Sequence, residues 1–291
     1  MADKFNKKFI LNADDFGMSK AYNTAIMEGA QKGFLMSTSL VANGAAFDEA
    51  VQKVIPECQN LGVGVHLNII EGKSLVKGLS ELTDETGNFN NSYLKLILKA
   101  YNPKNTDFME QLEKEFCAQI EKIRNEGIKI THIDSHVHTH AIPPIFELVC
   151  RLAKKYEISQ IRTQYEQLYF APDVFLHLNG TYPLNLIKIA LLKVFTIKNR
   201  LIVRKSGLQT NNYLIGVGYT SMMNNLTVAC GLAALKNKKN IVVEALIHPC
   251  RYEEGTIDNH FTEYRITRSE KLKDRIEQMG FEIGNYKSEQ E

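Results

Sequence analysis

Strand-like and helix-like patterns alternate along most of this chain, and that alternation constrains the fold more than any other feature. Short apolar runs such as KFILNAD at 8–14 and LGVGVHLNI at 61–69 are typical of strands, and an amphipathic segment or a polar loop follows each. Helices between successive strands are typical of a parallel sheet, open or closed into a barrel. The sequence therefore predicts an α/β fold. Strands are expected at 8–14, 35–43, 61–69, 128–136, 158–163 and 240–249, and helices at 19–33, 46–58, 106–126, 143–157, 224–237 and 267–280.

The size and composition of the chain are those of a globular protein and predict a single domain over 1–291. It has 291 residues, of which 44% are hydrophobic and 23% charged, enough for a large core. Its five cysteines are scattered without a CxxC pair, which indicates reduced thiols and a cytoplasmic location. We find no signal-peptide pattern, and no run approaches the roughly 20 apolar residues of a membrane span. The net charge of +2 identifies no partner, and we expect none among nucleic acids.

Side chains that bind metals end four of the predicted strands. Asp14 and Asp15 end the first strand, His66 the third, His136 the fourth and His248 the last. In parallel α/β folds the carboxyl ends of the strands open on one mouth, where ligands bind. Two adjacent carboxylates at the end of a buried strand are costly unless a cation lies beside them. We therefore expect a divalent metal ion at this mouth, bound by aspartate and histidine.

The segment THIDSHVHTH carries the densest group of such side chains, namely His132, Asp134, His136, His138 and His140. They occupy every second position, so a continuous strand would direct all of them to one face. Such a group has no explanation as a packed apolar core. Alternate strand residues lie roughly 6–7 Å apart, so the five cannot all bind one ion. One or two would be ligands, and the others, Asp134 and His138 among them, would support the ligands or contact substrate.

Each of these features also has an ordinary structural explanation when it is taken alone. Asp14 and Asp15 could cap a helix, His66 could be a hydrogen-bonded core histidine, and His248 could be a turn residue before Pro249. What favours a functional site is that all of them are expected at the same mouth.

Three motifs in a fixed order give the chain a family resemblance. They are ADDFG after the first strand, GVHLN in the third and THIDSHVH in the fourth. Together they resemble the YdjC-like carbohydrate deacetylases, a family that includes chitooligosaccharide deacetylases and enzymes linked to hopanoid biosynthesis. The resemblance covers about residues 9–163 and 240–283. It implies a (β/α) barrel-like fold related to the polysaccharide deacetylases, with a metal site at the carboxyl ends of the strands.

Carried over position by position, the resemblance implies that Asp15, His66 and His136 bind one divalent metal ion. It makes Asp14 the catalytic base and His248 a candidate acid. The ion would be Zn²⁺ or Mg²⁺, because two imidazoles favour zinc, whereas few protein ligands and several waters suit magnesium.

This residue set suits a metal-dependent hydrolase that removes an N-acetyl group from a saccharide containing an N-acetylhexosamine. The reaction needs an activated water, a stabilised oxyanion and a proton for the leaving amine, and no nucleophilic side chain. The sequence holds no GxSxG motif and no phosphate-binding glycine loop. One alternative is another metal-dependent hydrolase, an amidohydrolase or a phosphoesterase, although those folds usually open with an HxH pair on the first strand. The other is a non-catalytic sugar- or metal-binding protein, which would need neither Asp14 nor His248.

Residues 165–235 match no motif and are expected to form an insertion or an irregular part of the fold. No acidic residue lies between Asp173 and Glu244, and YPLNLIKIALLKVFTIKNRLIVRK at 182–205 is apolar and purely basic. One interpretation is a core helix with a solvated basic face. The other is peripheral contact with an anionic membrane, at its inner face, by an enzyme with a lipid-linked sugar substrate. In this second interpretation the head groups would meet Lys188, Lys193, Lys198, Arg200, Arg204 and Lys205. The oligomeric state stays open, and a homodimer is one expectation.

Overall fold

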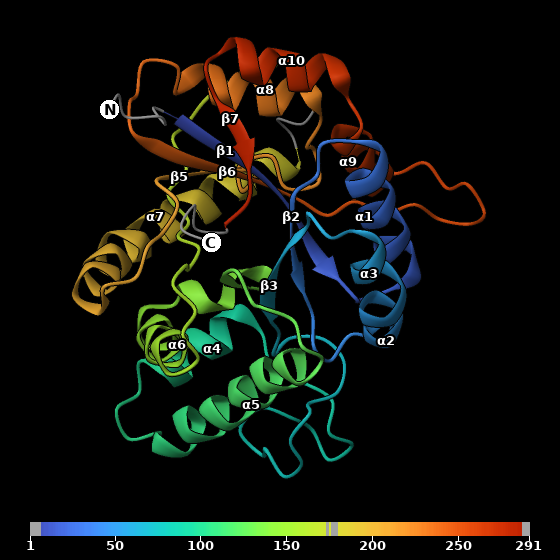
Figure 1. Cartoon of the computed structure of the whole chain (residues 1–291). Helices are drawn as coiled ribbons and strands as arrows, with labels where there is room; N and C mark the ends of the chain where they lie inside the picture. Colours follow the sequence, from blue (N-terminus) through green and yellow to red (C-terminus); the bar gives the residue numbers. More distant parts are fainter. Residues whose placement is uncertain (1–6, 173–174, 176–179, 287–291) are drawn as a thin grey trace.

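A parallel sheet lies at the centre of the molecule, and helices surround it (Figure 1). The computed structural model describes residues 7–172, 175 and 180–286. The strands are β1 (Lys7–Phe16), β2 (Ser37–Leu40), β3 (Gly62–Leu67), β4 (Ile133–Ser135), β5 (Tyr213–Ile215), β6 (Ile241–Ile247) and β7 (Glu282–Gly284). Their order is β4-β3-β2-β1-β6-β5, with β7 paired to β1 off this path. Every pairing between strands is parallel, as the strand–helix alternation predicts.

The helices and helical turns cover the sheet in groups. They are α1 (Lys20–Lys32), α2 (Phe47–Glu49), the π-helical η1 (Ala50–Val54), α3 (Ile55–Glu57), α4 (Tyr93–Ala100), α5 (Thr106–Asn125), the turn η2 (His136–Ala141), α6 (Pro143–Lys155), α7 (Thr181–Ser206), α8 (Asn225–Ala234), α9 (Asn259–Thr267) and α10 (Glu270–Gln278). Figure 1 shows α1, α3 and α9 on one side, α8 and α10 on a second, and α4, α5 and α6 on a third, with α7 at the margin opposite α1. Among the described helices, none combines the length and apolarity needed to cross a bilayer.

Strand β1 is the centre of the sheet because it is paired along both edges. Its residues Lys7–Ala13 pair with Ile241–Ile247 of β6. On the other edge β7 pairs with the first part of β1, and β2 pairs with the part from Asn12 onwards. An apolar run with both edges and both faces covered is typical of a buried parallel strand.

The sheet curls, and the segment predicted as a strand at 158–163 connects its two outer edges. Gln160 accepts a backbone hydrogen bond from Ile133 of β4 at 3.0 Å, and Ile161 donates one to Gln209, ahead of β5, at 3.0 Å. These are isolated bridges, so the segment is not a regular strand. It nevertheless lies between β4 and the chain leading into β5, and the predicted barrel-like α/β fold is confirmed.

Several local predictions are wrong. The predicted strand at 128–136 is regular only over Ile133–Ser135, because Val137 and His138 adopt left-handed backbone conformations that turn the chain into η2. Within the region expected to be irregular, α7 is a regular helix of 26 residues that ends at Gly207 in the left-handed conformation. The three-residue strands β5 and β7 and the helix α9 are absent from the sequence-based prediction.

The chain after β7 covers the sheet near the amino ends of the strands. Tyr286 is buried, stacks on the His132 ring with 4.3 Å between centroids, and donates its hydroxyl hydrogen bond to Glu244. The His132 ring crosses β3 at Gly64, where a Cβ atom would lie 2.4 Å from His132 Cε1. Glycine at position 64 therefore makes room for the imidazole.

We predict that Gly64→Ala destabilises the fold, because the added methyl group would overlap the buried His132 ring. The free energy of unfolding should fall by about 1–3 kcal/mol, as for overpacked cores. Chemical denaturation measures this change. The control is Gly180→Ala, since no atom of the residues described by the structure lies within 4 Å of a Cβ atom at that position. Equal stability of the two variants would contradict the close approach at Gly64.

Candidate functional site

A break in strand β1 explains how two adjacent aspartates reach the same site. Successive residues of a strand point to opposite faces. The pairing of β1 with β2 shifts register between Ala13 and Phe16, and Asp15 adopts a left-handed backbone conformation with φ of 64°. This irregularity interrupts the alternation, so the carboxylates of Asp14 and Asp15 both line one cavity at the carboxyl ends of the strands.

Three of the predicted residues come together around one oxygen atom. Asp15 Oδ1 lies 2.9 Å from His136 Nδ1 and 3.3 Å from His66 Nε2. One donor atom from each side chain lies within 4.8 Å of the others, and the group could hold a metal ion. Burial raises the pKa of Asp15, but the hydrogen bonds from His136 and His66 outweigh it and hold that pKa well below the usual value. Asp15 is therefore a carboxylate anion aimed at both imidazoles.

The second nitrogen of His66 is fixed in a way that suits metal binding. Its Nδ1 lies 2.8 Å from Asp134 Oδ1 and 3.0 Å from Ser39 Oγ. An ionised carboxylate only accepts, so Nδ1 carries the hydrogen, and a neutral ring then turns the Nε2 lone pair toward Asp15. Metal-binding histidines are commonly oriented by a carboxylate in this manner. The donor set and the orientation of His66 thus fit a divalent cation.

Protons compete with a cation for this position. Burial lowers the pKa of His66, but the charge of Asp134 and the hydrogen bonds to Asp134 and Asp15 outweigh it and raise the pKa to about 10. A metal ion must displace that proton, so its apparent affinity should rise with pH.

Arg162 is the centre of the site's charge network, and the sequence-based reasoning missed it. Its guanidinium is fully buried and forms hydrogen bonds of 2.7 Å with both oxygens of Asp14. Its Nη2 atom also lies 2.7 Å from Asp134 Oδ2, and its Nε donates to Glu244 Oε1 at 2.8 Å. Arg162 belongs to the predicted strand at 158–163, so the rule that strand ends carry the site could have found it.

The remaining members of this network are held at defined protonation states. Burial raises the pKa of Asp134, but the charges of Arg162 and His66 outweigh it and keep that pKa well below the usual value. Glu244 differs, since burial raises its pKa to about 7 even though the charge of Arg162 opposes the rise. The buried network therefore contains one carboxylate that binds a proton near neutral pH.

His248 lines the same cavity directly after β6, whose residue Ile247 pairs with Ala13 of β1. Its Nδ1 lies 3.4 Å from Glu263 Oε2, and its carbonyl oxygen lies 2.8 Å from His260 Nδ1. Burial lowers the pKa of His248, but the hydrogen bond to Glu263 and the charges of Glu263 and Asp15 outweigh it and raise the pKa to about 9. The ring is therefore a cation at neutral pH and can donate a proton into the cavity. Glu263, on α9, was not predicted.

The cavity has a volume of about 190 Å³, and all the predicted site residues except Asp134 line it. Its lining also includes Lys188 of α7, for which the sequence suggested another role. Burial lowers the pKa of Lys188, and no carboxylate of the described residues lies within ion-pair distance of it. The Nδ1 atom of His138 is buried without a hydrogen-bond partner. Lys188 is thus a charged group of the cavity lining that has no carboxylate partner among the described residues and can meet a ligand.

The period-two group of THIDSHVHTH does not share one face, because the strand ends at Ser135. His136 reaches the metal-compatible cluster and His138 lines the cavity beside it. His132 instead stacks on Tyr286 near the amino ends of the strands. His140 is buried against the backbone of Arg162, with its Nε2 atom 3.1 Å from the Arg162 oxygen. The expectation of a single polar face is therefore wrong.

The curled parallel sheet thus gathers Asp15, His66 and His136 at its strand ends, in an arrangement that could hold a metal ion. Comparison with known proteins is more specific: the YdjC-like protein family matches residues 8–278, and the chain belongs to that family.

Relatives with assigned activities match part of the chain. It is 41% identical over 151 residues to a carbohydrate deacetylase of Clostridium beijerinckii, covering 52% of this chain and 58% of that protein. It is 43% identical over 153 residues to carbohydrate deacetylase 1 of Listeria innocua, covering 52% and 59%. The chain thus matches somewhat more than half the length of these relatives. The chain also resembles a crystal structure from Enterococcus faecalis V583, described in connection with cellobiose-phosphate cleavage. The TM-score is 0.74 with 22% sequence identity, and the match covers 97% of this chain and 98% of that one. This similarity shows a shared fold.

We predict that Arg162→Met strongly destabilises the protein, because Asp14, Asp134 and Glu244 would lose their shared buried counter-charge. Removing one side of a buried ion pair typically costs about 3–5 kcal/mol in the free energy of unfolding. Denaturant titration at neutral pH measures it. The control is Arg151→Met, because Arg151 is exposed and its ion pair with Glu113 is worth only about 0–1 kcal/mol. Similar losses for both variants would contradict a central role for Arg162.

Proposed function

We propose that this protein is a metal-dependent N-deacetylase that removes the acetyl group from an N-acetylhexosamine within a saccharide. One observation carries the proposal: Asp14, fixed by Arg162, lies beside the cluster of Asp15, His66 and His136 and shares its cavity with His248. Membership of the YdjC-like family and the relatives named carbohydrate deacetylase support the same chemistry.

Asp15, His66 and His136 are the proposed ligands of one divalent ion. When bound, such an ion supplies Lewis acidity for the acetamide carbonyl and lowers the pKa of a bound water. Two imidazoles and one carboxylate favour Zn²⁺, and Mg²⁺ is the second candidate. Asp134 holds His66 in place, and His138, in the same cavity, is proposed to contact substrate.

Asp14 is the proposed general base. Arg162 contacts both of its oxygens and Asn12 Nδ2 donates to its Oδ1 at 2.7 Å, so the carboxylate cannot rotate freely. Oδ1 accepts from both Arg162 and Asn12, whereas Oδ2 accepts from Arg162 alone and keeps its second lone-pair direction open. Asp14 can therefore accept a proton from a water held beside Asp15 while its own position stays fixed.

His248 is the proposed general acid. With a pKa of about 9 it is protonated at neutral pH, and Glu263 orients the ring. It can give its proton to the amine that leaves when the amide bond breaks. The two proposed proton carriers, Asp14 and His248, line one cavity from the ends of the paired strands β1 and β6.

The cavity also supports a substrate that carries negative charge. Lys188 lines it and is partly buried, and burial lowers its pKa, so its ammonium group gains from an anionic partner. A phosphate group attached to the saccharide, as in a lipid-linked sugar, would provide one. We place the enzyme in the cytoplasm on its five free cysteines.

Mass spectrometry of a substrate panel tests the proposed activity. The purified protein is incubated with Zn²⁺ or Mg²⁺ and free, phosphorylated or lipid-linked N-acetylhexosamine saccharides. Products lacking one acetyl group are expected, with release of acetate. Release of phosphate instead would favour a phosphoesterase, and metal or sugar binding without any product would favour a binding protein.

We predict that His136→Ala loses bound metal, because the ligand set loses one of its two imidazoles. Elemental analysis of the purified variant, after dialysis against metal-free buffer, should show well under one equivalent. The control is His138→Ala, which removes a neighbouring histidine from the same cavity and should retain the metal. If the two variants exchange these outcomes, His138 rather than His136 is the ligand.

We predict that Asp14→Asn keeps its metal and fold but loses turnover. The substitution is nearly isosteric, and Arg162 retains two other carboxylates, Asp134 and Glu244. Loss of proton abstraction should lower kcat by on the order of 10²–10⁴. Steady-state kinetics on the identified substrate measure this, with Asp107→Asn at an exposed position as control. Near-normal kcat in metal-replete Asp14→Asn would refute the role of Asp14.

A further inference from the structure

Helix α7 exposes an apolar stripe that the rest of the described chain does not cover. Leu184 and Ile187 are each 68% exposed and Val194 is 64% exposed, at positions that recur every three or four residues. The opposite side of the helix is buried against the body of the protein, as expected for an amphipathic helix. A stripe with apolar side chains on its outer side is unusual for a surface helix. Its exposed apolar members are Leu184, Leu186, Ile187, Leu191, Val194, Ile197 and Leu201.

Helix α4 extends this stripe into a broader face. Leu94 and Leu98 are each 66% exposed, and Tyr101, directly after the helix, is also exposed. Lys198 of α7 places its Nζ atom 5.9 Å from the centre of the Tyr101 ring, so the two helices are neighbours there. We call the exposed apolar residues of α7 and α4, with Tyr101, the α7–α4 face.

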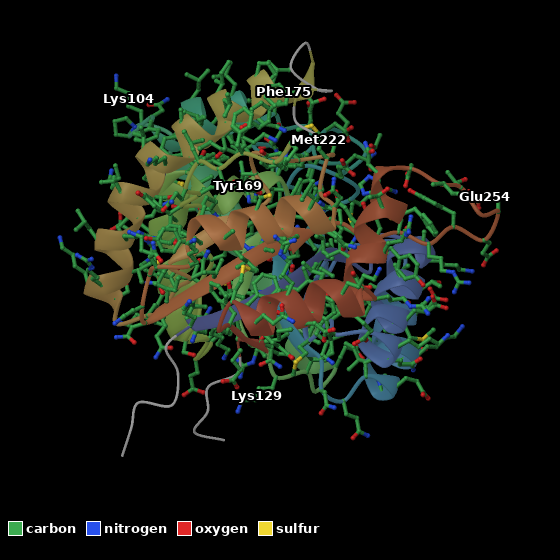
Figure 2. The ribbon with its side chains drawn as sticks, turned by 90° about the horizontal axis from the view of Figure 1, so that it is seen from above. Lys104, Lys129, Tyr169, Phe175, Met222 and Glu254 are labelled. Carbon is green, nitrogen blue, oxygen red and sulfur yellow. The ribbon has the colours of Figure 1, made fainter. Side chains whose placement is uncertain are left out.

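Aromatic residues lie near the other end of α7. Tyr219 contacts both Tyr169 and Tyr182, which holds the segment at 168–170 beside the first turn of the helix. The neighbouring Leu168, Phe170 and Phe175 are exposed. Figure 2 shows Phe175 at the margin where α7 runs and Glu254 on the far side of the molecule.

The charged residues of α7 are all positive. Lys198, Arg204 and Lys205 are exposed on α7, and the sequence has no acidic residue from 174 to 243. Two cations expected at a membrane lie elsewhere, because Lys193 and Arg200 lie over the Tyr165 ring, at 5.2 Å and 4.6 Å from its centre. Lys188 faces the cavity. The face therefore combines apolar side chains with three exposed cations.

We propose that the α7–α4 face binds the surface of an anionic lipid bilayer, and that the site acts on sugars carried by lipids in that bilayer. Apolar side chains would enter the head-group region, while Lys198, Arg204 and Lys205 meet anionic lipids. A second copy of the chain is the alternative occupant, which a measurement of the oligomeric state tests. The substrate part of this inference rests on the proposed deacetylase function, whereas membrane binding does not.

The cavity lies close to this face. Lys188 lines the cavity from α7, on the same helix as the apolar stripe. Val137, exposed in η2, lines it as well, and the Tyr93 hydroxyl of α4 lies 3.5 Å from the His138 oxygen. Both helices of the face thus adjoin the elements that form the cavity. A sugar attached to a lipid phosphate could enter it while its carrier stays in the bilayer.

Co-sedimentation with vesicles tests the binding. The full chain is mixed, without substrate, with phosphatidylcholine vesicles or with vesicles of phosphatidylcholine and phosphatidylglycerol, at low and high salt. We expect binding to the anionic vesicles that weakens with salt. The triple variant Leu184→Gln, Ile187→Gln, Val194→Gln should lower the partition coefficient by roughly tenfold or more. The matched control is Leu226→Gln, Ile257→Gln, which removes exposed apolar residues outside the face.

Each outcome bears on one part of the inference. Negligible binding to both vesicle types overturns the membrane role, as does equal binding by the triple variant and the control. Light scattering that shows a dimer lost only in the triple variant would assign the face to self-association and overturn the proposal. Turnover of a saccharide that the unmodified protein deacetylates in detergent-free solution separates the two proposals, because the triple variant should retain it. If the unmodified protein deacetylates none of the free, phosphorylated or lipid-linked saccharides, the deacetylase function alone is contradicted.

Discussion

The buried ion pairs of Arg162 are the interaction on which the rest of the structure depends. One guanidinium contacts carboxylates from three strands, Asp14 of β1, Asp134 of β4 and Glu244 of β6. Arg162 itself lies in the segment that connects the outer edges of the curled sheet, where its backbone bonds to Ile133 of β4. The same side chain therefore links closure of the fold to the position of the site. Removing this cation would leave three buried carboxylates without their shared counter-charge, which is costly.

This network also leaves the site with surplus negative charge. Asp14, Asp134 and Glu244 share one guanidinium, and Asp15 adds a further carboxylate at the mouth. This surplus negative charge contributes to the raised pKa values of His66 and His248. A divalent cation between Asp15 and the imidazoles would offset it more fully than protons do. The site is thus electrostatically prepared for a metal before any ligand geometry is considered.

The sequence predicts the position of this site well and its internal geometry less well. Strand alternation is a local signal, so the rule that strand ends share one mouth brings Asp15, His66, His136 and His248 to one cavity, as observed. Asp15 and Val137 adopt left-handed backbone conformations that depend on tertiary contacts. Neither residue is a glycine, so the sequence does not mark these positions as left-handed. The first lets adjacent aspartates share a site, and the second ends the strand that the histidine periodicity predicts. The position of Arg162 near a predicted strand end could have pointed to the site, but its three carboxylate partners follow from pairing across the barrel, which no local pattern encodes.

Helix α7 shows how one amphipathic element can relate a cavity to a surface. Its period of 3.6 residues places Asn185, Ile189 and Leu192 against the body of the protein and Leu184 and Ile187 outward, while Lys188 faces the cavity between them. Moving the outward side chains into a bilayer would therefore bring Lys188 and the cavity to the depth of lipid phosphates. A sugar held there needs no extraction from its carrier, which removes the cost of exposing an acyl chain to water. The helix would then determine both where the protein binds and which sugars reach Asp14.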